Sequence, residues 1–226
     1  ATTEIYTLSL HDALPIFLGE SYGTLRRMSI DWRLQTYANG HRIDSWKART
    51  ADGGGALFNF GSHAVHAVEW LAGPISRLSA EIRRADDDPR DGDSAVDIRA
   101  ELACGTDCRI HIDTDDAERR HHEIRFEFDR THLVLRNHTA DYVDGFEIGY
   151  ERAGAFEPIL METCNPERPN ITDGRIAASA AVAARFLAAI GSGGSVFPDA
   201  AEGLRTQIIL DCAMKSYDQR AWIDVP

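Results

Sequence analysis

Two histidines and an asparagine are spaced so that a single helix would hold them on one face. The stretch 53–73 opens with a run of glycines and continues with the periodicity of a helix. At about 100° per residue, one stripe of that helix carries Asn59, His63, His66 and Trp70. An imidazole titrates near neutral pH and can take a proton from a bound hydroxyl group, and an amide can orient the ring. We therefore expect this stripe to face a cleft.

Each of these residues also has an ordinary structural role open to it. The opposite stripe is apolar and predicts the face packed on a core, with Leu57, Phe60, Ala64, Val68 and Leu71. A lone histidine opposite such a stripe is more often structural than catalytic, Asn59 can simply cap the helix, and the glycines can form a loop that needs no ligand. His63 and His66 could share a metal ion, but no third ligand is evident, so we expect no metal site.

The elements that must position this helix are predicted from alternating apolar and polar residues. That pattern predicts strands over 25–34, 75–85, 96–102, 108–112, 124–128, 132–136, 146–151 and 222–225. Short links such as Gly105-Thr106-Asp107 predict that the three middle strands form antiparallel hairpins. Two more helices follow, an Ala-rich one ending at Ile190 and one beginning after Phe197. The fold class is α+β, an open and predominantly antiparallel sheet with helices on one face and mixed charges on the other.

Bulk composition limits the kind of protein. The chain has 226 residues, enough for one domain, and is 43% hydrophobic and 27% charged, as globular proteins are. Its formal net charge of -12 argues against a nucleic-acid partner. No apolar run reaches membrane-spanning length. The cysteines lack the paired spacing of a zinc site and predict reduced thiols in a cytoplasmic protein; they are Cys104, Cys108, Cys164 and Cys212.

Two predicted loops and the first sixteen residues lie outside the predicted helices and strands. The charged segment 86–92 predicts a solvated loop, and 165–173 predicts a Pro-rich loop. Residues 1–16, when back-translated, resemble a common short-read sequencing adapter. The hypothesis is that the reading frame begins inside adapter DNA joined to a truncated gene. We therefore expect 1–16 to be a non-native segment, and we read the fold from 17–226.

Three stretches together resemble the Gfo/Idh/MocA (glucose–fructose oxidoreductase / inositol dehydrogenase) family. The first is Gly53-Gly54-Gly55 followed by Asn59, His63 and the ending Trp70-Leu71-x-Gly73, which is similar to the family pattern GGG-x-x-x-D-x-G-x-H and its W-L-x-G helix end. The second, Gly92-Asp93-Ser94-Ala95, resembles the start of the family's open sheet. The third resembles its C-terminal helix and last strand and comprises Pro198, Glu202-Gly203-Leu204, Ser216 and Trp222-Ile223.

The resemblance covers about residues 17–226 and implies that they form only the second of the family's two domains, the substrate-binding and oligomerisation domain. No G-x-G-x-x-G follows a strand, as the nucleotide-binding domain would require, and the family's Glu-Lys-Pro motif is missing. The family oxidises a sugar or cyclitol hydroxyl by hydride transfer to NAD or NADP. His63 takes the position of its catalytic histidine. Asn59 stands where the family usually has an aspartate, which would stabilise the imidazolium as an amide cannot.

The resemblance also implies partners and further site residues. His66 stands where the family often has a second aspartate, and Trp46-Lys47 resembles a pair whose cation reaches substrate or cofactor. We expect His63 to be catalytic and Asn59, His66, Trp46 and Lys47 to bind substrate. The parent protein would use NAD or NADP and a polyol or sugar. The fragment itself would bind neither cofactor, nucleic acid nor membrane, would be inactive, and would form a homodimer through the open sheet face.

Two other hypotheses remain open. The chain can be a stand-alone, non-catalytic domain that binds a carbohydrate or a protein. The full-length parent can also be a non-catalytic relative, which the replacement at Asn59 allows.

Overall fold

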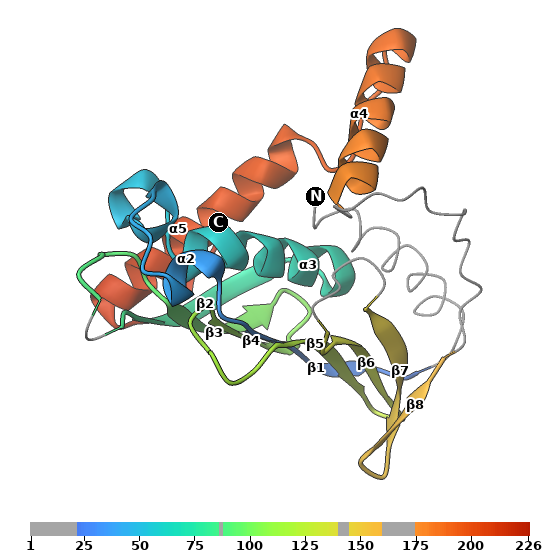
Figure 1. Cartoon of the computed structure of the whole chain (residues 1–226). Coiled ribbons are helices and arrows are strands. Elements are labelled where there is room, and N and C mark those ends of the chain that lie inside the picture. The colour runs from blue at the N-terminus through green and yellow to red at the C-terminus, as the bar shows by residue number, and fades with distance from the viewer. Residues whose placement is uncertain (1–21, 86–87, 140–144, 160–174) are drawn as a thin grey trace.

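The computed structural model describes residues 22–85, 88–139, 145–159 and 175–226. Its centre is one nine-stranded sheet, in the order β8-β7-β6-β5-β1-β4-β3-β2-β9 (Figure 1). The strands are β1 (Leu25–Arg33), β2 (Ile75–Arg83), β3 (Ala95–Leu102), β4 (Asp107–Asp113), β5 (His121–Phe128), β6 (His132–Asn137), β7 (Glu147–Arg152), β8 (Ala155–Pro158) and β9 (Ile223–Asp224). The predicted strands are all present, and β8 is an addition to them.

The topology is predominantly antiparallel, as the sequence predicts, with one exception. β1 pairs antiparallel with β5 on one side and parallel with β4 on the other. The expected hairpin between β4 and β5 is therefore wrong, although β3 and β4 do form one. β1 takes the central place because alternate residues, Met28, Ile30 and Trp32, are buried and both of its edges are hydrogen-bonded.

The helices that cover the sheet lie on one face of it. α3 (Ser62–Ala72) and α5 (Ala200–Gln219) pack against each other, and α5 packs on β2 (Figure 1). α4 (Arg175–Ser192) stands away from them. Arg205 on α5 joins three parts of this layer, because its guanidinium donates to the Glu69 carboxylate of α3 and to the Ile75 carbonyl of β2, both at 2.9 Å. Ser216 Oγ accepts from the Ala80 amide at 3.0 Å and so fixes α5 to the sheet.

The predicted helix over 53–73 is shorter than expected and begins differently. Residues Leu57–Gly61 form one π-helical turn, and regular α-helix begins at Ser62. Before it, the chain makes the short helix α2 (Tyr37–Gly40) and two 3-10 turns, Trp46–Ala48 and Thr50–Asp52. A π-turn widens the helix locally and is often found at functional sites. The buried positions of this segment are Leu57, Gly61, Ala64, Val65 and Val68.

The described part of the charged loop, residues 88–92, is not simply solvated, which corrects the expectation from sequence for these residues. Side chains of Arg90 and Asp88 are only 8% and 11% exposed. Arg90 Nε donates to Asp88 Oδ1 at 2.8 Å, and Arg90 NH1 donates to the carbonyls of Ala38 at 2.8 Å and Ile43 at 3.1 Å. The bonds from Arg90 lower the pKa of the Asp88 carboxyl to about 2. The pair therefore ties this loop to the segment around α2.

Some sequence features lie outside the described residues, namely 1–16, Cys164 and the Pro-rich loop 165–173. Cys104, Cys108 and Cys212 form no disulfide with one another. Among the described helices, none combines the length and the apolar character that crossing a bilayer requires.

Candidate active site

Two cavities meet at His63. The first, of about 590 Å³, lies between α2, the Trp46–Ala48 turn and the start of α3; its lining includes Trp32, Trp46, Lys47, Asn59, His63 and Asp93. The second, of about 560 Å³, lies between α3, α5 and the sheet; its lining includes Trp32, His63, His66, Trp70, His122 and Glu202. Both include Trp32 and His63, so His63 can reach a ligand in either one.

His63 is a half-buried imidazole on the wall of both cavities. Among the described residues, neither of its ring nitrogens has a hydrogen-bond partner. Its ring lies 6.4 Å from that of Trp32, centroid to centroid. Burial lowers the pKa of His63, and the charge of His66 lowers it further. The ring is therefore neutral at pH 7, which is the form that can accept a proton.

Asn59 lies on the wall of the same cavity as His63, but part of its side chain is already used. Its Nδ2 donates to the Gly55 carbonyl at 3.0 Å, within its own helical segment. The described residues give its Oδ1 no donor. Asn59 can therefore accept a hydrogen bond from a ligand hydroxyl through Oδ1.

The glycine run is explained by packing inside the domain. A Cβ at Gly54 would lie 2.2 Å from the Trp46 carbonyl oxygen, and one at Gly55, where φ is +95°, would lie 2.0 Å from Asp93 Oδ1. Asp93 Oδ2 accepts from the Leu57 amide at 2.8 Å and so holds the start of the helical segment. Burial raises the pKa of Asp93. These two glycines thus set the position of Asn59 and His63 without needing a ligand of their own.

Trp46 and Lys47 lie at the rim of the first cavity. Trp46 is 52% exposed, and Lys47 Nζ lies 5.8 Å from the centroid of its ring. Both groups can therefore meet a molecule that enters from outside.

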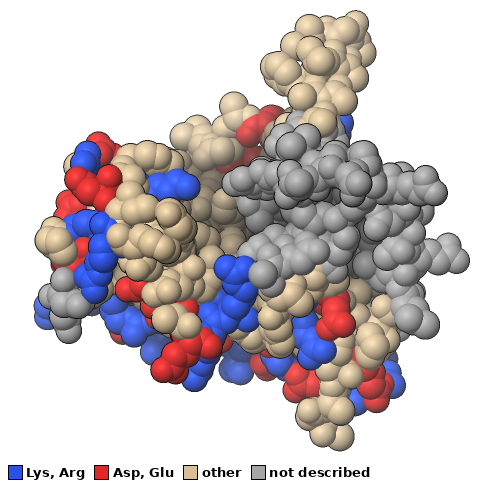
Figure 2. All heavy atoms as spheres, viewed as in Figure 1, with Lys and Arg blue, Asp and Glu red and all other residues tan. Residues whose placement is uncertain are grey.

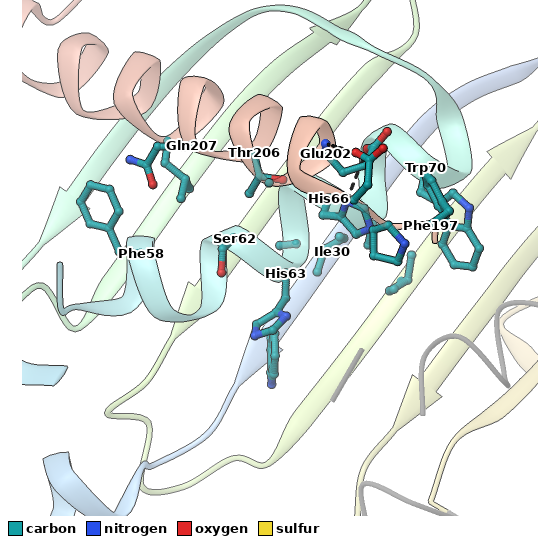
Figure 3. Close-up of a pocket in the computed structure, with 18 of the residues that line it drawn as sticks. Ile30, Phe58, Ser62, His63, His66, Trp70, Phe197, Glu202, Thr206 and Gln207 are labelled. Atoms are coloured by element: carbon teal, nitrogen blue, oxygen red, sulfur yellow. Dashed lines mark hydrogen bonds and ion pairs between the residues drawn. The ribbon is translucent and has the colours of Figure 1, made fainter. Parts of the chain in front are cut away.

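His66 lines the second cavity with His63, whereas Asn59, Trp46 and Lys47 line the first. Its Nδ1 lies 4.0 Å from Glu202 Oε2, and its ring lies 6.5 Å from that of Phe197. Figure 3 shows His66 and Glu202 facing each other between α3 and α5, while His63 projects away from α5. The structure thus brings Asn59, Trp46 and Lys47 together with His63, and brings His66 to His63 from the other side.

Sequence reasoning missed two residues at this site. The rings of Trp32 and His122 stack at 4.1 Å between centroids, with 18° between their planes. Trp32 Nε1 is buried and has no hydrogen-bond partner in the described part of the chain. Burial lowers the pKa of His122 to about 3. The alternation of β1 places Trp32 in the core correctly, but nothing in the sequence indicates that it lines two cavities.

Comparison with known proteins defines the class of this fold. The model of the Gfo/Idh/MocA C-terminal domain matches residues 19–134. The chain therefore belongs to the Gfo/Idh/MocA family. A curated relative, an uncharacterised oxidoreductase of Synechocystis sp., is 28% identical over 217 residues, which cover 90% of this chain and 58% of the relative.

Solved structures share the fold. Levoglucosan dehydrogenase in complex with NADH superposes with a TM-score of 0.76 and 20% identity, over 95% of this chain and 62% of that one. An oxidoreductase domain protein from Kribbella flavida superposes with a TM-score of 0.77 and 19% identity, over 100% of this chain and 65% of that one. The WlbA dehydrogenase from Bordetella pertussis, in complex with NADH and UDP-GlcNAcA, superposes with a TM-score of 0.70 and 15% identity, over 96% of this chain and 59% of that one. The chain thus spans less than two thirds of the length of these relatives.

Proposed function

We propose that this chain is the substrate-binding domain of an NAD(P)-dependent oxidoreductase that oxidises a hydroxyl group of a sugar or cyclitol, with His63 as the base. The observation that carries the proposal is the half-buried imidazole of His63, whose ring nitrogens have no partner among the described residues, at the junction of two cavities. The NADH complexes of related dehydrogenases, one of them with levoglucosan and one with L-sorbose, support the substrate class.

Residues of this chain can accept the proton that the substrate hydroxyl loses on oxidation. Oxidation of a secondary alcohol removes a hydride from carbon and a proton from oxygen. NAD(P)⁺, when bound, supplies the acceptor for the hydride. His63, neutral at pH 7, accepts the hydroxyl proton and becomes an imidazolium, which then releases the proton to water. Asn59 Oδ1 accepts a hydrogen bond from a neighbouring substrate hydroxyl, and the partly buried cavity wall around Trp32 limits the access of water.

The described residues fit one side of a cofactor site. The exposed indole of Trp46 can stack on a flat ring, and the Lys47 ammonium can meet a phosphate. We propose that the remaining contacts come from a nucleotide-binding domain of a longer parent protein. Calorimetric titration of this chain with NAD⁺ and NADP⁺ tests this division, since we expect no binding in the micromolar range. Micromolar binding would show that the chain holds the cofactor by itself.

Turnover by the longer protein tests the role of His63. The protein encoded by the gene with its upstream DNA is assayed against a panel of sugars and cyclitols with NAD⁺ and with NADP⁺. His63→Ala should lower kcat by about 10² to 10⁴, the usual contribution of a general base. His132→Ala, an exposed position on β6, is the matched control and should leave turnover unchanged. Unchanged turnover in His63→Ala would remove this residue from the mechanism.

A non-catalytic, carbohydrate-binding domain is the second candidate. The indole of Trp46 favours it, because an aromatic ring that is 52% exposed at the rim of a cavity can pack on the face of a sugar with no chemistry involved. The DNA upstream of Phe17 separates the candidates. A start codon directly before this residue would favour the stand-alone domain, and finding the code for residues 1–16 in genomic DNA would rule out the adapter origin of that segment.

We also propose that the outer sheet face pairs two copies of the chain. Figure 2 shows charges of both signs along the lower edge of the molecule, below the sheet. Ion pairs on the outer face of the sheet include Arg77–Glu101 at 2.9 Å and Arg33–Asp31 at 2.7 Å. Sedimentation equilibrium should give a dimer, and Ser29→Glu in β1 should weaken it, whereas Lys215→Glu on α5 should not. A monomer at every concentration would overturn the proposal.

A further inference from the structure

The outer face of the sheet carries a second cluster of ionisable side chains, on the side opposite α3 and α5. His121 and Glu123 are two residues apart on β5, so both point to the same face. Asp31 lies opposite Glu123 on the neighbouring strand β1. His138 follows directly after β6, the strand on the other side. Three segments of the chain thus bring two imidazoles and two carboxylates together.

The register of β5 and β6 makes the two histidines neighbours. His122 pairs with Asn137, so His121 and His138 lie across from each other, and their rings stack at 4.6 Å between centroids. Asn137 Oδ1 accepts from the Thr139 amide at 2.8 Å, which fixes the turn that carries His138. One nitrogen each from His121 and His138 and one oxygen from Glu123 all lie within 4.8 Å of one another.

Neighbouring groups lie against two of these side chains, Glu123 and His121. Arg125 donates to Glu123 Oε1 from NH2 at 2.8 Å and from Nε at 3.2 Å, so both bonds hold one oxygen of the carboxylate. Asp31 Oδ2 lies 3.9 Å from His121 Nε2. A carboxylate beside a ligating histidine, and a hydrogen bond to a ligating carboxylate, are the usual supports of a protein metal site.

We propose that His121, Glu123 and His138 bind a divalent transition-metal ion of the zinc class, with water in the remaining position. Imidazole and carboxylate ligands suit Zn²⁺, whereas Mg²⁺ and Ca²⁺ prefer oxygen ligands alone. Ligand atoms around a tetrahedral zinc lie about 3.3 Å apart, so the three side chains must draw together when the ion binds. A hollow of about 370 Å³ lies beside His121 and His138 and leaves room for that movement and for the water; it is lined also by Asp31, Arg33, Glu118, Arg119 and Arg120.

This site is separate from the candidate active site. His63 and His66 lie on α3, on the other face of the sheet, and His121 alternates with His122, which points to that inner face. The proposed ion would cross-link β5 to the end of β6, and Asp31 would position His121 from β1. Its role is therefore to hold three neighbouring segments of the sheet together.

Calorimetric titration of the whole chain with ZnCl₂ tests the proposal. We expect one ion per chain at micromolar or tighter Kd and a rise in Tm. His138→Ala and Glu123→Gln should each weaken binding by at least about tenfold, and Asp31→Asn by about ten- to a hundredfold. His138 is exposed, so its replacement should leave the metal-free fold intact, as circular dichroism can verify.

Control variants separate this site from other places where zinc can bind. His132→Ala, His66→Ala and Cys104→Ser remove an exposed histidine, a histidine of the second cavity and an exposed thiol. All three should bind zinc as the unaltered chain does. Absence of binding below millimolar ZnCl₂, or a loss in these controls with none in His138→Ala, would overturn the proposal.

Discussion

At the scale of single residues, His63 and His122 show how burial separates two histidines of one site. Both pKa values are lowered by burial, but His63 is only half-buried and faces two cavities, whereas His122 is 3% exposed and stacks on Trp32. His63 can therefore exchange protons with a ligand and with water. His122 stays neutral throughout the neutral range and serves the packing between β5 and β1.

The state of His122 predicts an acid sensitivity of the fold. Its pKa is 6.5 in the unfolded chain and about 3 in the folded one, so below pH 6.5 the unfolded chain takes up a proton that the folded chain does not. The free energy of unfolding should fall by about 1.4 kcal/mol per pH unit from this residue as pH drops from 6.5 toward 3. Urea unfolding of His122→Phe between about pH 7 and 5 should show a shallower decline than the unaltered chain. A parallel decline in the two proteins would contradict the assignment.

The charge of the side chain at position 59 should influence the pKa of His63. A carboxylate one helical turn before an imidazole favours the imidazolium, and the amide present here does not. Asn59→Asp should therefore raise the pKa of His63 above its lowered value, as followed by the ring Cε1–H resonance in an NMR titration of the chain. Asn59→Gln keeps the side chain neutral and is the control. Equal shifts in both variants would mean that the charge at this position does not reach the ring.

At the scale of elements, the local sequence pattern predicts where most strands lie along the chain, but it does not predict their order in the sheet. Alternating burial in β1 to β5 follows the alternation of apolar residues, because each strand has one face in the core. The insertion of β1 between β4 and β5 depends on hydrogen bonds between strands distant in sequence, which no local pattern encodes. The same holds for the Asp88–Arg90 pair, whose burial comes from α2, about fifty residues earlier.

The start of the site helix was the element that sequence described least well. The stripe of Asn59 and His63 was predicted for a regular helix, and a π-turn replaces its beginning. Asp93 stabilises that turn, because its carboxylate accepts a hydrogen bond from the Leu57 amide. The same carboxylate occupies the space where a Cβ of residue 55 would lie. The motif around Gly92 marked the start of a sheet, and its contact with the glycine run required the folded chain.

Two glycines of this run should differ sharply in their tolerance of alanine. Gly53 has φ +75° and open space where a Cβ would lie, so Gly53→Ala should cost only the left-handed backbone, about 1–2 kcal/mol. Gly55 has φ +95° and would place its Cβ against Asp93, so Gly55→Ala should cost about 2 kcal/mol more. Urea unfolding of the two variants side by side measures the difference. Equal losses would mean that Asp93 moves aside freely.

At the scale of the whole molecule, stability is concentrated in the sheet and the two helices packed on it. The core joins residues of β1 to β7 with α3 and α5, and Leu78 of β2 is fully buried within it. Large apolar side chains of α4 lie in solvent rather than in the core: Phe186, Leu187 and Ile190 are 58%, 66% and 64% exposed. Its helix is also mostly uncharged in Figure 2 and stands away from α3 and α5 in Figure 1.

Two identical substitutions test this division of the molecule. Leu78→Ala removes a buried side chain between β2 and α5 and should lower the free energy of unfolding by about 2–5 kcal/mol. Leu187→Ala removes an exposed one from α4, where alanine also has the higher helix propensity, and should change it by less than about 0.5 kcal/mol. Both are measured by urea unfolding of dilute protein, which keeps the chains apart. A loss of several kcal/mol in Leu187→Ala would mean that α4 packs on the rest of the chain in solution, and the core would then have to include it.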